Sequence, residues 1–292
     1  MNNAIFISIM GRKININESQ KGKLFEAYSD GFTFDKLTEL GKESLQGINC
    51  GPLQIKYCTE YLGYPFAEGS SRIVYTLSDN IILKLAYGLK YHAGIEQNKF
   101  EWKLFQEANT PLLPRIFACD DNFTYLVSES VNPAEYVDFE KILGIPYTNE
   151  YMQRSEKIPL YFGKEGDAKV GYNDYFDDLK GLYERYNGYC VKNILAYITY
   201  KNVLMPTASP YDIEKIMERD NCPTMKVDSD EIERIIKETE WFSEVDKLSK
   251  KFGLYDFGIT NFGIVNRNGT PLIVILDSGF NLDIFKKYYL RR

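Results

Sequence analysis

The hydrophobic pattern of the chain changes its period twice, and these changes limit the folds that it can form. Residues 66–131 hold short runs rich in Ile, Val, Leu and Tyr, with one segment of helical spacing over 93–108. Residues 132–252 are mainly helical in pattern, and β character returns over 262–277. This order predicts an α+β fold with a β-rich lobe, a helical lobe and a cleft between them for a small ligand.

Local signals place the individual elements. The dipeptide Asp79-Asn80 is a tight-turn signal between strands expected over 72–78 and 80–87. The clearest helix is expected over 230–252, because its apolar residues line one face. The other expected features are a strand over 4–10, a helix around 34–45, strands over 115–119 and 124–131, and helix caps at Ser229 or Asp228 and at Gly253.

Composition excludes several classes of protein. The 35 basic and 41 acidic residues give a net charge of −6, so a nucleic-acid partner is not expected. The one histidine, His92, is expected on the surface and rules out a multi-histidine metal site. The five cysteines form no C-x-x-C pair and are expected to be free thiols of a cytoplasmic protein. No apolar run approaches the roughly 18–20 residues of a membrane helix, so no membrane partner is expected.

The C-terminal hairpin brings polar side chains to its open end. With a three-residue loop over 268–270, Asn261 lies opposite Asp277, whereas a two-residue turn at Asn268-Gly269 sets Asn261 opposite Leu276. In either register Asn261 and Asp277 come within a few ångströms of each other.

Asp256, five residues before Asn261, adds a second carboxylate at the same place. Carboxylate and amide oxygens are hard ligands of the kind that Mg²⁺ prefers, and one of the carboxylates is free to orient a hydroxyl.

At these positions the chain resembles the protein kinase-like superfamily. Residues 255–261 (YDFGITN) look like the catalytic loop, in which an Asp is followed five residues later by an Asn. Residues 275–280 (ILDSGF) resemble the element with the metal-binding Asp. Residues 81–86 (IILKLA) resemble the third strand with its phosphate-binding lysine, Lys84, and Glu101 matches the glutamate that pairs with that lysine.

Two further segments extend the resemblance. Residues 68–75 resemble a reduced glycine-rich loop, in which the backbone amides of 69–72, including Gly69, Ser70 and Ser71, would cover the phosphates of ATP. The segment from Glu129 to Val131 falls where the hinge between the lobes would be, and its backbone would receive the adenine.

The resemblance implies an ATP- and Mg²⁺-dependent phosphotransferase that acts on an unidentified protein or small-molecule hydroxyl. Lys84 would hold the α- and β-phosphates, with Glu101 keeping its ammonium in place. Asp277 and Asn261 would hold Mg²⁺, and Asp256 would orient the proton of the attacking hydroxyl.

Each residue also has a structural explanation. Lys84 could protect the edge of a sheet, and Glu101 could be a solvated helix residue with Glu96 as a rival for the same role. Asp256 and Asn261 could be capping or turn residues.

The chain departs from the protein kinase pattern in three ways. Tyr255 replaces the usual His, Gly258 replaces the usual Lys, and Ser278 replaces the Phe after the metal-binding Asp. Only 15 residues follow Asp277, which leaves no room for an activation segment or for the helices that dock peptide substrates. This layout looks like the compact kinase-like proteins of bacteriophages and some bacteria. A cytoplasmic location is expected, which for a phage-encoded protein is the cytoplasm of the host.

We therefore expect a bilobal kinase-like fold in three parts. These are an extension of unknown role over 1–63, a β-rich N-lobe over 64–131, and a helical C-lobe over 132–292 that carries the catalytic loop and the metal-binding hairpin. Two other functions stay open: a pseudokinase that binds nucleotide and a partner protein, and a transferase of AMP that holds the nucleotide reversed.

Overall fold

The protein has an α+β fold, in agreement with the fold class expected from the sequence. A computed structural model describes residues 5–9, 12–16, 31–46, 52–148, 169–186, 188–220 and 227–290. The contacts divide the chain into two compact units. The first comprises 1–109, 113–131 and 278–292, and the second comprises 110–112 and 132–277.

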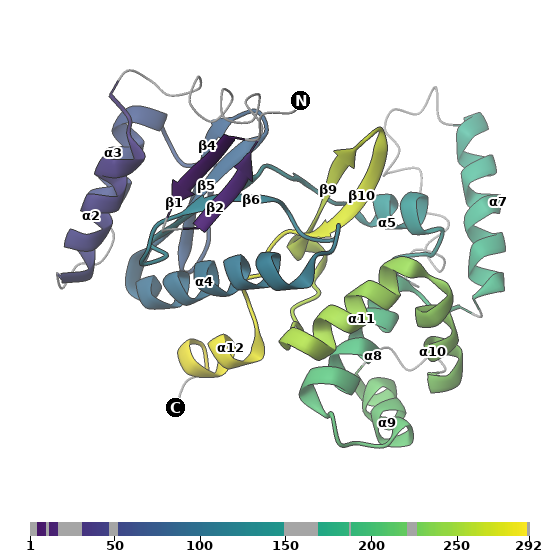
Figure 1. Cartoon of the computed structure of the whole chain (residues 1–292). Helices are drawn as coiled ribbons and strands as arrows, with labels where there is room; N and C mark the ends of the chain where they lie inside the picture. Colours follow the sequence, from purple (N-terminus) through teal and green to yellow (C-terminus); the bar gives the residue numbers. More distant parts are fainter. Residues whose placement is uncertain are drawn as a thin grey trace. The chain divides into compact units, whose positions relative to one another are not determined.

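The first unit is built on a five-stranded antiparallel sheet in the order β3-β4-β5-β7-β6 (Figure 1). Its two longest strands, β4 and β5, flank the expected turn at Asp79-Asn80. The strands expected over 115–119 and 124–131 are β6 and β7, each slightly shorter than predicted. The bounds of the sheet strands are Ala67–Glu68 (β3), Arg72–Ser78 (β4), Ile81–Ala86 (β5), Ile116–Cys119 (β6) and Tyr125–Glu129 (β7). A separate pair consists of β1 (Ile5–Ile9) and β2 (Arg12–Ile16).

One face of this sheet is covered by helices from the N-terminal part of the chain. The odd-numbered residues of β4 and β5, such as Tyr75 and Leu83, form a buried cluster with Leu37 of α2 (Phe34–Gln46) and Cys58 of α3 (Pro52–Leu62). Gln54 of α3 donates hydrogen bonds to the carbonyl of Leu37 and to Thr124 Oγ1. The role of 1–63 was left open by the sequence. Residues 31–46 and 52–62 of this segment cover this face of the sheet.

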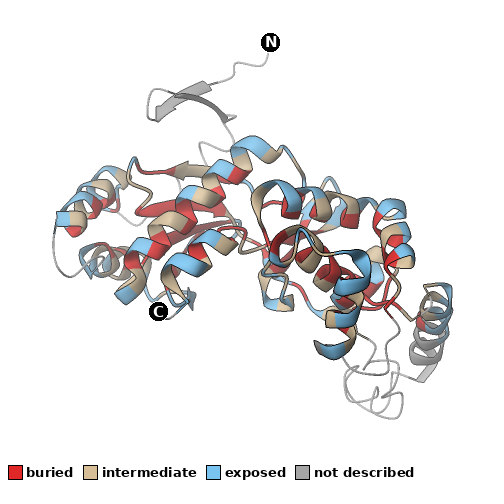
Figure 2. Cartoon of the chain, turned by 90° about the horizontal axis from the view of Figure 1, so that it is seen from below, coloured by how far each residue is buried: buried red, intermediate tan, exposed pale blue. Residues whose placement is uncertain are grey.

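The even-numbered residues of the same strands face α4 (Tyr91–Ala108). Gly94 brings the first turn of α4 against the sheet, because a Cβ atom there would lie 2.2 Å from the carbonyl oxygen of Ser71 and 2.9 Å from Ala86 Cα. Farther along, Trp102 and Phe105 pack against a cluster that includes Leu126. Buried residues accordingly occupy the strands and the inward faces of the helices (Figure 2).

Gly94→Ala is expected to destabilise the first unit by about 3 kcal/mol, because the atoms that the new methyl group meets belong to the backbone and cannot move aside. The matched control is Gly181→Ala in α7 (Lys169–Arg185), where nothing lies within 4 Å of the added Cβ. This control should be neutral or stabilising by up to about 1 kcal/mol. Urea unfolding of both variants measures the difference, and equal midpoints would contradict the close packing.

The second unit contains a small sheet and a set of helices. Its three strands have the order β10-β9-β8, and the expected hairpin is formed by β9 and β10. The strand bounds are Asn132–Pro133 (β8), Phe262–Arg267 (β9) and Thr270–Ile275 (β10). The helices are α5 (Tyr136–Leu143), α7, α8 (Val191–Thr199), the π-helix η3 (Tyr200–Leu204), α9 (Pro210–Asp220), α10 (Ser229–Glu238) and α11 (Glu240–Phe252).

The hairpin has the two-residue register. Thr270 pairs with Arg267, so the turn is Asn268-Gly269, and both residues have positive φ angles of 56° and 82°. Such angles are typical of the tight turns that join twisted strands. The alternative with a three-residue loop is wrong.

The single helix expected over 230–252 is two helices, α10 and α11. Thr239 between them is extended, with φ −106° and ψ 110°. The four polar residues 237–240 give a full helical turn without an apolar side chain, so nothing in the core holds that turn straight. Both outer ends are as predicted: the Asp228 side chain accepts from the amides of 230 and 231, and Gly253 ends α11 at φ 70°.

The last described residues belong to the first unit. They form α12 (Leu282–Tyr288), which begins at the N-cap Asn281 and lies beside α4 (Figure 1). The expected boundary places 278–292 in the helical lobe, but this segment belongs to the first unit, where α12 contacts the helix that carries Glu101.

Cys58, Cys119 and Cys190 are buried and form no disulfide, as expected from the sequence, and His92 is exposed. Cys50 and Cys222 lie outside the described residues. Within the part of the chain that the structure describes, no helix combines the length and the apolar character needed to span a membrane.

Candidate functional site

Lys84 lies on a central strand of the first unit. Its strand, β5, is hydrogen-bonded to β4 on one side and to β7 on the other, and the residue is only 5% exposed. A residue that protects a sheet edge would lie on an outer strand and in water. The edge explanation for Lys84 is therefore wrong.

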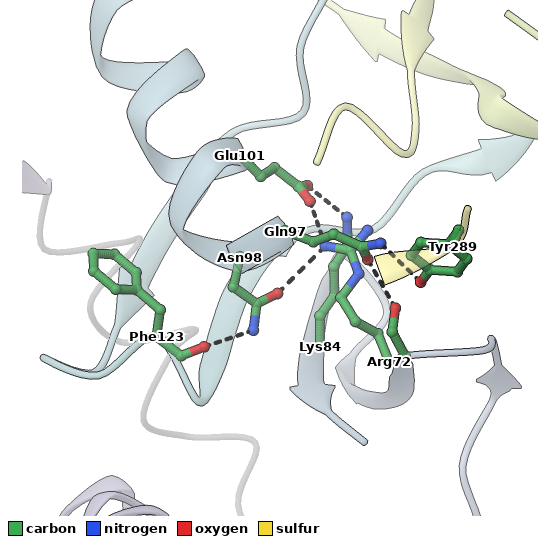
Figure 3. A network of polar contacts seen from close by, with 8 residues as sticks. Arg72, Lys84, Gln97, Asn98, Glu101, Phe123 and Tyr289 are labelled. Atoms are coloured by element: carbon green, nitrogen blue, oxygen red, sulfur yellow. Dashed lines mark hydrogen bonds and ion pairs between the residues drawn. The ribbon is translucent and has the colours of Figure 1, made fainter. Parts of the chain in front are cut away.

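Glu101 of α4 lies directly against Lys84. Its Oε1 atom is 2.6 Å from Lys84 Nζ, and the glutamate is 2% exposed, so it is not a solvated helix residue (Figure 3). Its rival Glu96 instead forms an exposed ion pair with Lys287, with 3.3 Å between Oε1 and Nζ. A buried carboxylate needs a cation and hydrogen bonds to stay charged, and Lys84 supplies both.

A second cation on the same carboxylate was not anticipated. Arg72 Nη1 lies 2.6 Å from Glu101 Oε2, and it also donates to Asn98 Oδ1 at 3.3 Å. Asn98 in turn donates to the carbonyl of Phe123 at 2.9 Å, which fixes the orientation of its amide (Figure 3). The signal was present in the sequence, because 72 and 84 are both even-numbered positions on paired strands and so face α4 together.

The residues proposed as a glycine-rich loop form a short connection between β3 and β4. The Gly69 N–H donates to the Arg72 carbonyl at 2.8 Å, so this amide is engaged within the loop. From the sequence, this amide was expected to be one of the phosphate donors. Ser70 is exposed, whereas Ser71 is buried and donates from Oγ to Gln97 Oε1 at 3.0 Å.

The expected hinge residues lie at the end of the first unit, which includes Val131 and gives way to the second unit at Asn132. The Glu129 N–H donates to the Arg115 carbonyl at 2.8 Å, and its side chain accepts from the Arg115 N–H at 3.0 Å. Glu129 is therefore tied to β6, while Val131 is buried.

Asp256 and Asn261 are held together by one loop of the second unit. The loop follows the end of α11 and closes with the 3₁₀ turn η4 (Ile259–Asn261). Asn261 Nδ2 donates to the Asp256 carbonyl at 3.0 Å, so the side-chain oxygen of Asn261 is the atom left to act as a ligand. The five-residue spacing of Asp256 and Asn261 thus lets this hydrogen bond close the loop.

Asp277 follows the end of β10 and belongs to the same group. The Leu276 N–H donates to the Asn261 carbonyl at 2.7 Å, which continues the hairpin register to the residue before Asp277. Partial shielding of the Asp256 carboxylate from water raises its pKa, and the negative charge of Asp277 raises it further. Two carboxylates that disfavour each other's charge are relieved by a cation between them.

The donor set fits Mg²⁺. Among the residues that the structure describes, no cluster holds three or more His, Cys, Asp or Glu side chains. The available protein ligands are thus two carboxylates and the amide oxygen of Asn261. Magnesium is commonly held by one or two carboxylates together with the phosphates of a substrate, rather than by a full protein cage.

Asp277→Asn is expected to lower the pKa of Asp256, because it removes the neighbouring negative charge that raises it. The control is Asp230→Asn, an exposed residue of α10 in the same unit, which should leave the Asp256 pKa unchanged. A titration of the carboxyl carbons by ¹³C NMR measures both. An unchanged or higher Asp256 pKa in Asp277→Asn would show that the two carboxylates do not interact.

The structure thus forms two groups of candidate residues, each within its own unit. The first unit joins Lys84 to Glu101 and adds Arg72, and the second unit joins Asp256, Asn261 and Asp277. Comparisons with protein-family models, with curated proteins and with solved structures found no match to this chain.

Proposed function

We propose that the protein is an ATP- and Mg²⁺-dependent phosphotransferase with a protein kinase-like arrangement. The observation that carries this proposal is the buried ion pair between Lys84 and Glu101. Lys84 lies on the third strand of a five-stranded antiparallel sheet, and Glu101 lies on the helix that follows. Protein kinases require the same pair, from the same two elements, to hold the phosphates of ATP.

The residues of the first unit bind and orient the nucleotide in this proposal. Lys84 donates to the α- and β-phosphates, and Glu101 keeps the ammonium group in place. Arg72, on the other oxygen of Glu101, holds that carboxylate from the opposite side. The backbone of Glu129–Val131 receives the adenine.

The residues of the second unit act at the transferred phosphate. Asp277 and the side-chain oxygen of Asn261 hold Mg²⁺, which neutralises phosphate charge as it develops. Asp256 orients the acceptor hydroxyl and takes its proton. The partial burial of Asp256, which raises its pKa, suits this role because a stronger base accepts a proton more readily.

The proposal is tested by incubating the full chain with Mg²⁺ and ATP labelled at either the α- or the γ-phosphate. Label is followed on the protein, on added protein and aminoglycoside acceptors, and in released phosphate. Transfer or release of γ-label supports the phosphotransferase. Transfer of α-label would instead identify an AMP transferase. If neither label moves while ATP raises the melting temperature, the protein is a nucleotide-binding pseudokinase; without that rise, the nucleotide site itself is refuted.

A further inference from the structure

The C-terminal segment over 278–290 lies against α4 at two adjacent positions. At Gly279 a Cβ atom would lie 2.8 Å from the carbonyl oxygen of Gln97 and 3.2 Å from Arg72 Nη1, so only glycine lets the chain pass this closely. Farther along, Lys287 pairs with Glu96. Positions 96 and 97 are one helical turn before Glu101, and 97 and 101 share a face of α4.

Tyr289 connects this segment to two other elements. Its hydroxyl accepts a hydrogen bond from Gln97 Nε2 at 3.2 Å (Figure 3). It shares another with Ser70 Oγ, also at 3.2 Å. Lys90 Nζ lies 3.6 Å from the centre of the Tyr289 ring, a favourable cation–π distance. The ring is further held edge-on by Phe280, with 5.0 Å between centroids.

Gln97 completes the connection through the other end of its amide. Its Oε1 atom accepts from the buried Ser71 Oγ, while its Nε2 atom donates to Tyr289. Both serines of the loop are therefore tied to α4, Ser71 directly and Ser70 through Tyr289. Hydrogen bonds therefore connect the loop over 69–71, α4 and the residue that follows α12.

We infer that Tyr289 is a positioning residue that fixes the loop over 69–71 relative to α4, and that segment 278–290 is an intramolecular clamp on the helix that carries Glu101. The clamp stabilises the arrangement in which Glu101 contacts Lys84. Its consequence for ATP rests on the proposed function, whereas the clamp itself is a property of the first unit alone. Tyr289 acts through Gln97 and Ser70 and takes no part in the chemistry.

The clamp is tested by Tyr289→Phe, which removes both hydrogen bonds and keeps the ring. The matched control is Tyr288→Phe, the adjacent tyrosine, whose hydroxyl interacts with Lys287 rather than with Gln97 or Ser70. Amide hydrogen exchange should become about fivefold faster over 69–72 and 91–101 in Tyr289→Phe, the change expected for loss of about one net hydrogen bond. Exchange over β9 and β10 should not change. Equal exchange in the two variants, or a uniform rise over the whole chain, would overturn the clamp.

The same variants give a second measurement if the γ-label moves. The KM for ATP should rise about fivefold in Tyr289→Phe with kcat within about twofold, because binding is weakened and the catalytic groups are intact. Ser70→Ala should raise the KM by no more than Tyr289→Phe does, and the double variant should add nothing to Tyr289→Phe, since the Ser70 bond is one of the two that Tyr289→Phe already removes. A fall in kcat at constant KM, or fully additive effects, would overturn the role in positioning the loop. If no label moves, the exchange experiment still decides on the clamp independently of the proposed function.

Discussion

Asp256→Ala is expected to reduce γ-phosphate transfer by about 10²–10⁴-fold and to leave Mg²⁺-dependent ATP affinity within about twofold. Asp256 is assigned to the acceptor hydroxyl, so its loss removes proton transfer and orientation but no phosphate contact. Asp277→Ala is expected to abolish the Mg²⁺-dependent part of ATP binding, because it removes a carboxylate ligand. The two aspartates thus give opposite results in a binding titration, although both variants lose turnover.

Calorimetric titration of ATP with and without Mg²⁺, together with γ-label transfer, separates the two roles. Asp230→Ala, an exposed carboxylate of α10, is the control and should change neither quantity. Melting curves of all variants show whether each is folded. If Asp277→Ala binds ATP as tightly as the unaltered protein in the presence of Mg²⁺, its role as a metal ligand is refuted.

Glu101→Ala is expected to lower the free energy of unfolding by about 3–5 kcal/mol, because it leaves Lys84 and Arg72 buried without the carboxylate that both contact. Glu96→Ala, on the same helix but in an exposed ion pair, should change it by less than about 1 kcal/mol. Urea unfolding compares the two variants. Equal effects would show that the buried carboxylate is not important for stability.

A triple variant separates the effect of these buried charges on stability from their effect on ATP binding. Arg72→Met, Lys84→Met and Glu101→Leu together replace the buried charges by apolar groups of similar size, which is often neutral or stabilising. We expect the triple variant to regain most of the stability lost in Glu101→Ala and to lose ATP binding. Recovery of both stability and ATP binding would show that the ion pairs serve neither.

Local signals in the sequence were sufficient for most of the first unit's sheet and for the hairpin. Both turns need only neighbouring residues. The turn at Asp79-Asn80 was predicted, and the turn at Asn268-Gly269 was one of the two loops that the sequence left open. Lys84 lies on β5 and Glu101 on the α-helix that follows it, so packing that helix against the strand is enough to bring the two side chains together. The break at Thr239 was missed because Ile235 and Phe242 share one face of an uninterrupted helix, and the polar turn between them carries no separate signal.

Contacts between distant parts of the chain were beyond a reading of the sequence. Tyr289 meets Ser70 across more than two hundred residues, and no local pattern assigns α12 to the first unit rather than the second. Gly279 is informative only once its neighbour Gln97 is known. The role of Arg72 could be predicted only in part. Strand alternation places it on the same face of the sheet as Lys84, but it does not reveal that both side chains contact Glu101.

The covering of the sheet by α2 and α3 determines how the protein can be divided for experiments. A fragment that starts at residue 64, as the sequence boundaries suggest, would leave the side chains of Tyr75, Leu83 and their cluster in contact with water. An apolar surface of that kind promotes aggregation. Expression trials of the first unit should therefore begin before residue 31, and shorter fragments are expected to precipitate even when Lys84, Glu101 and Arg72 are all present.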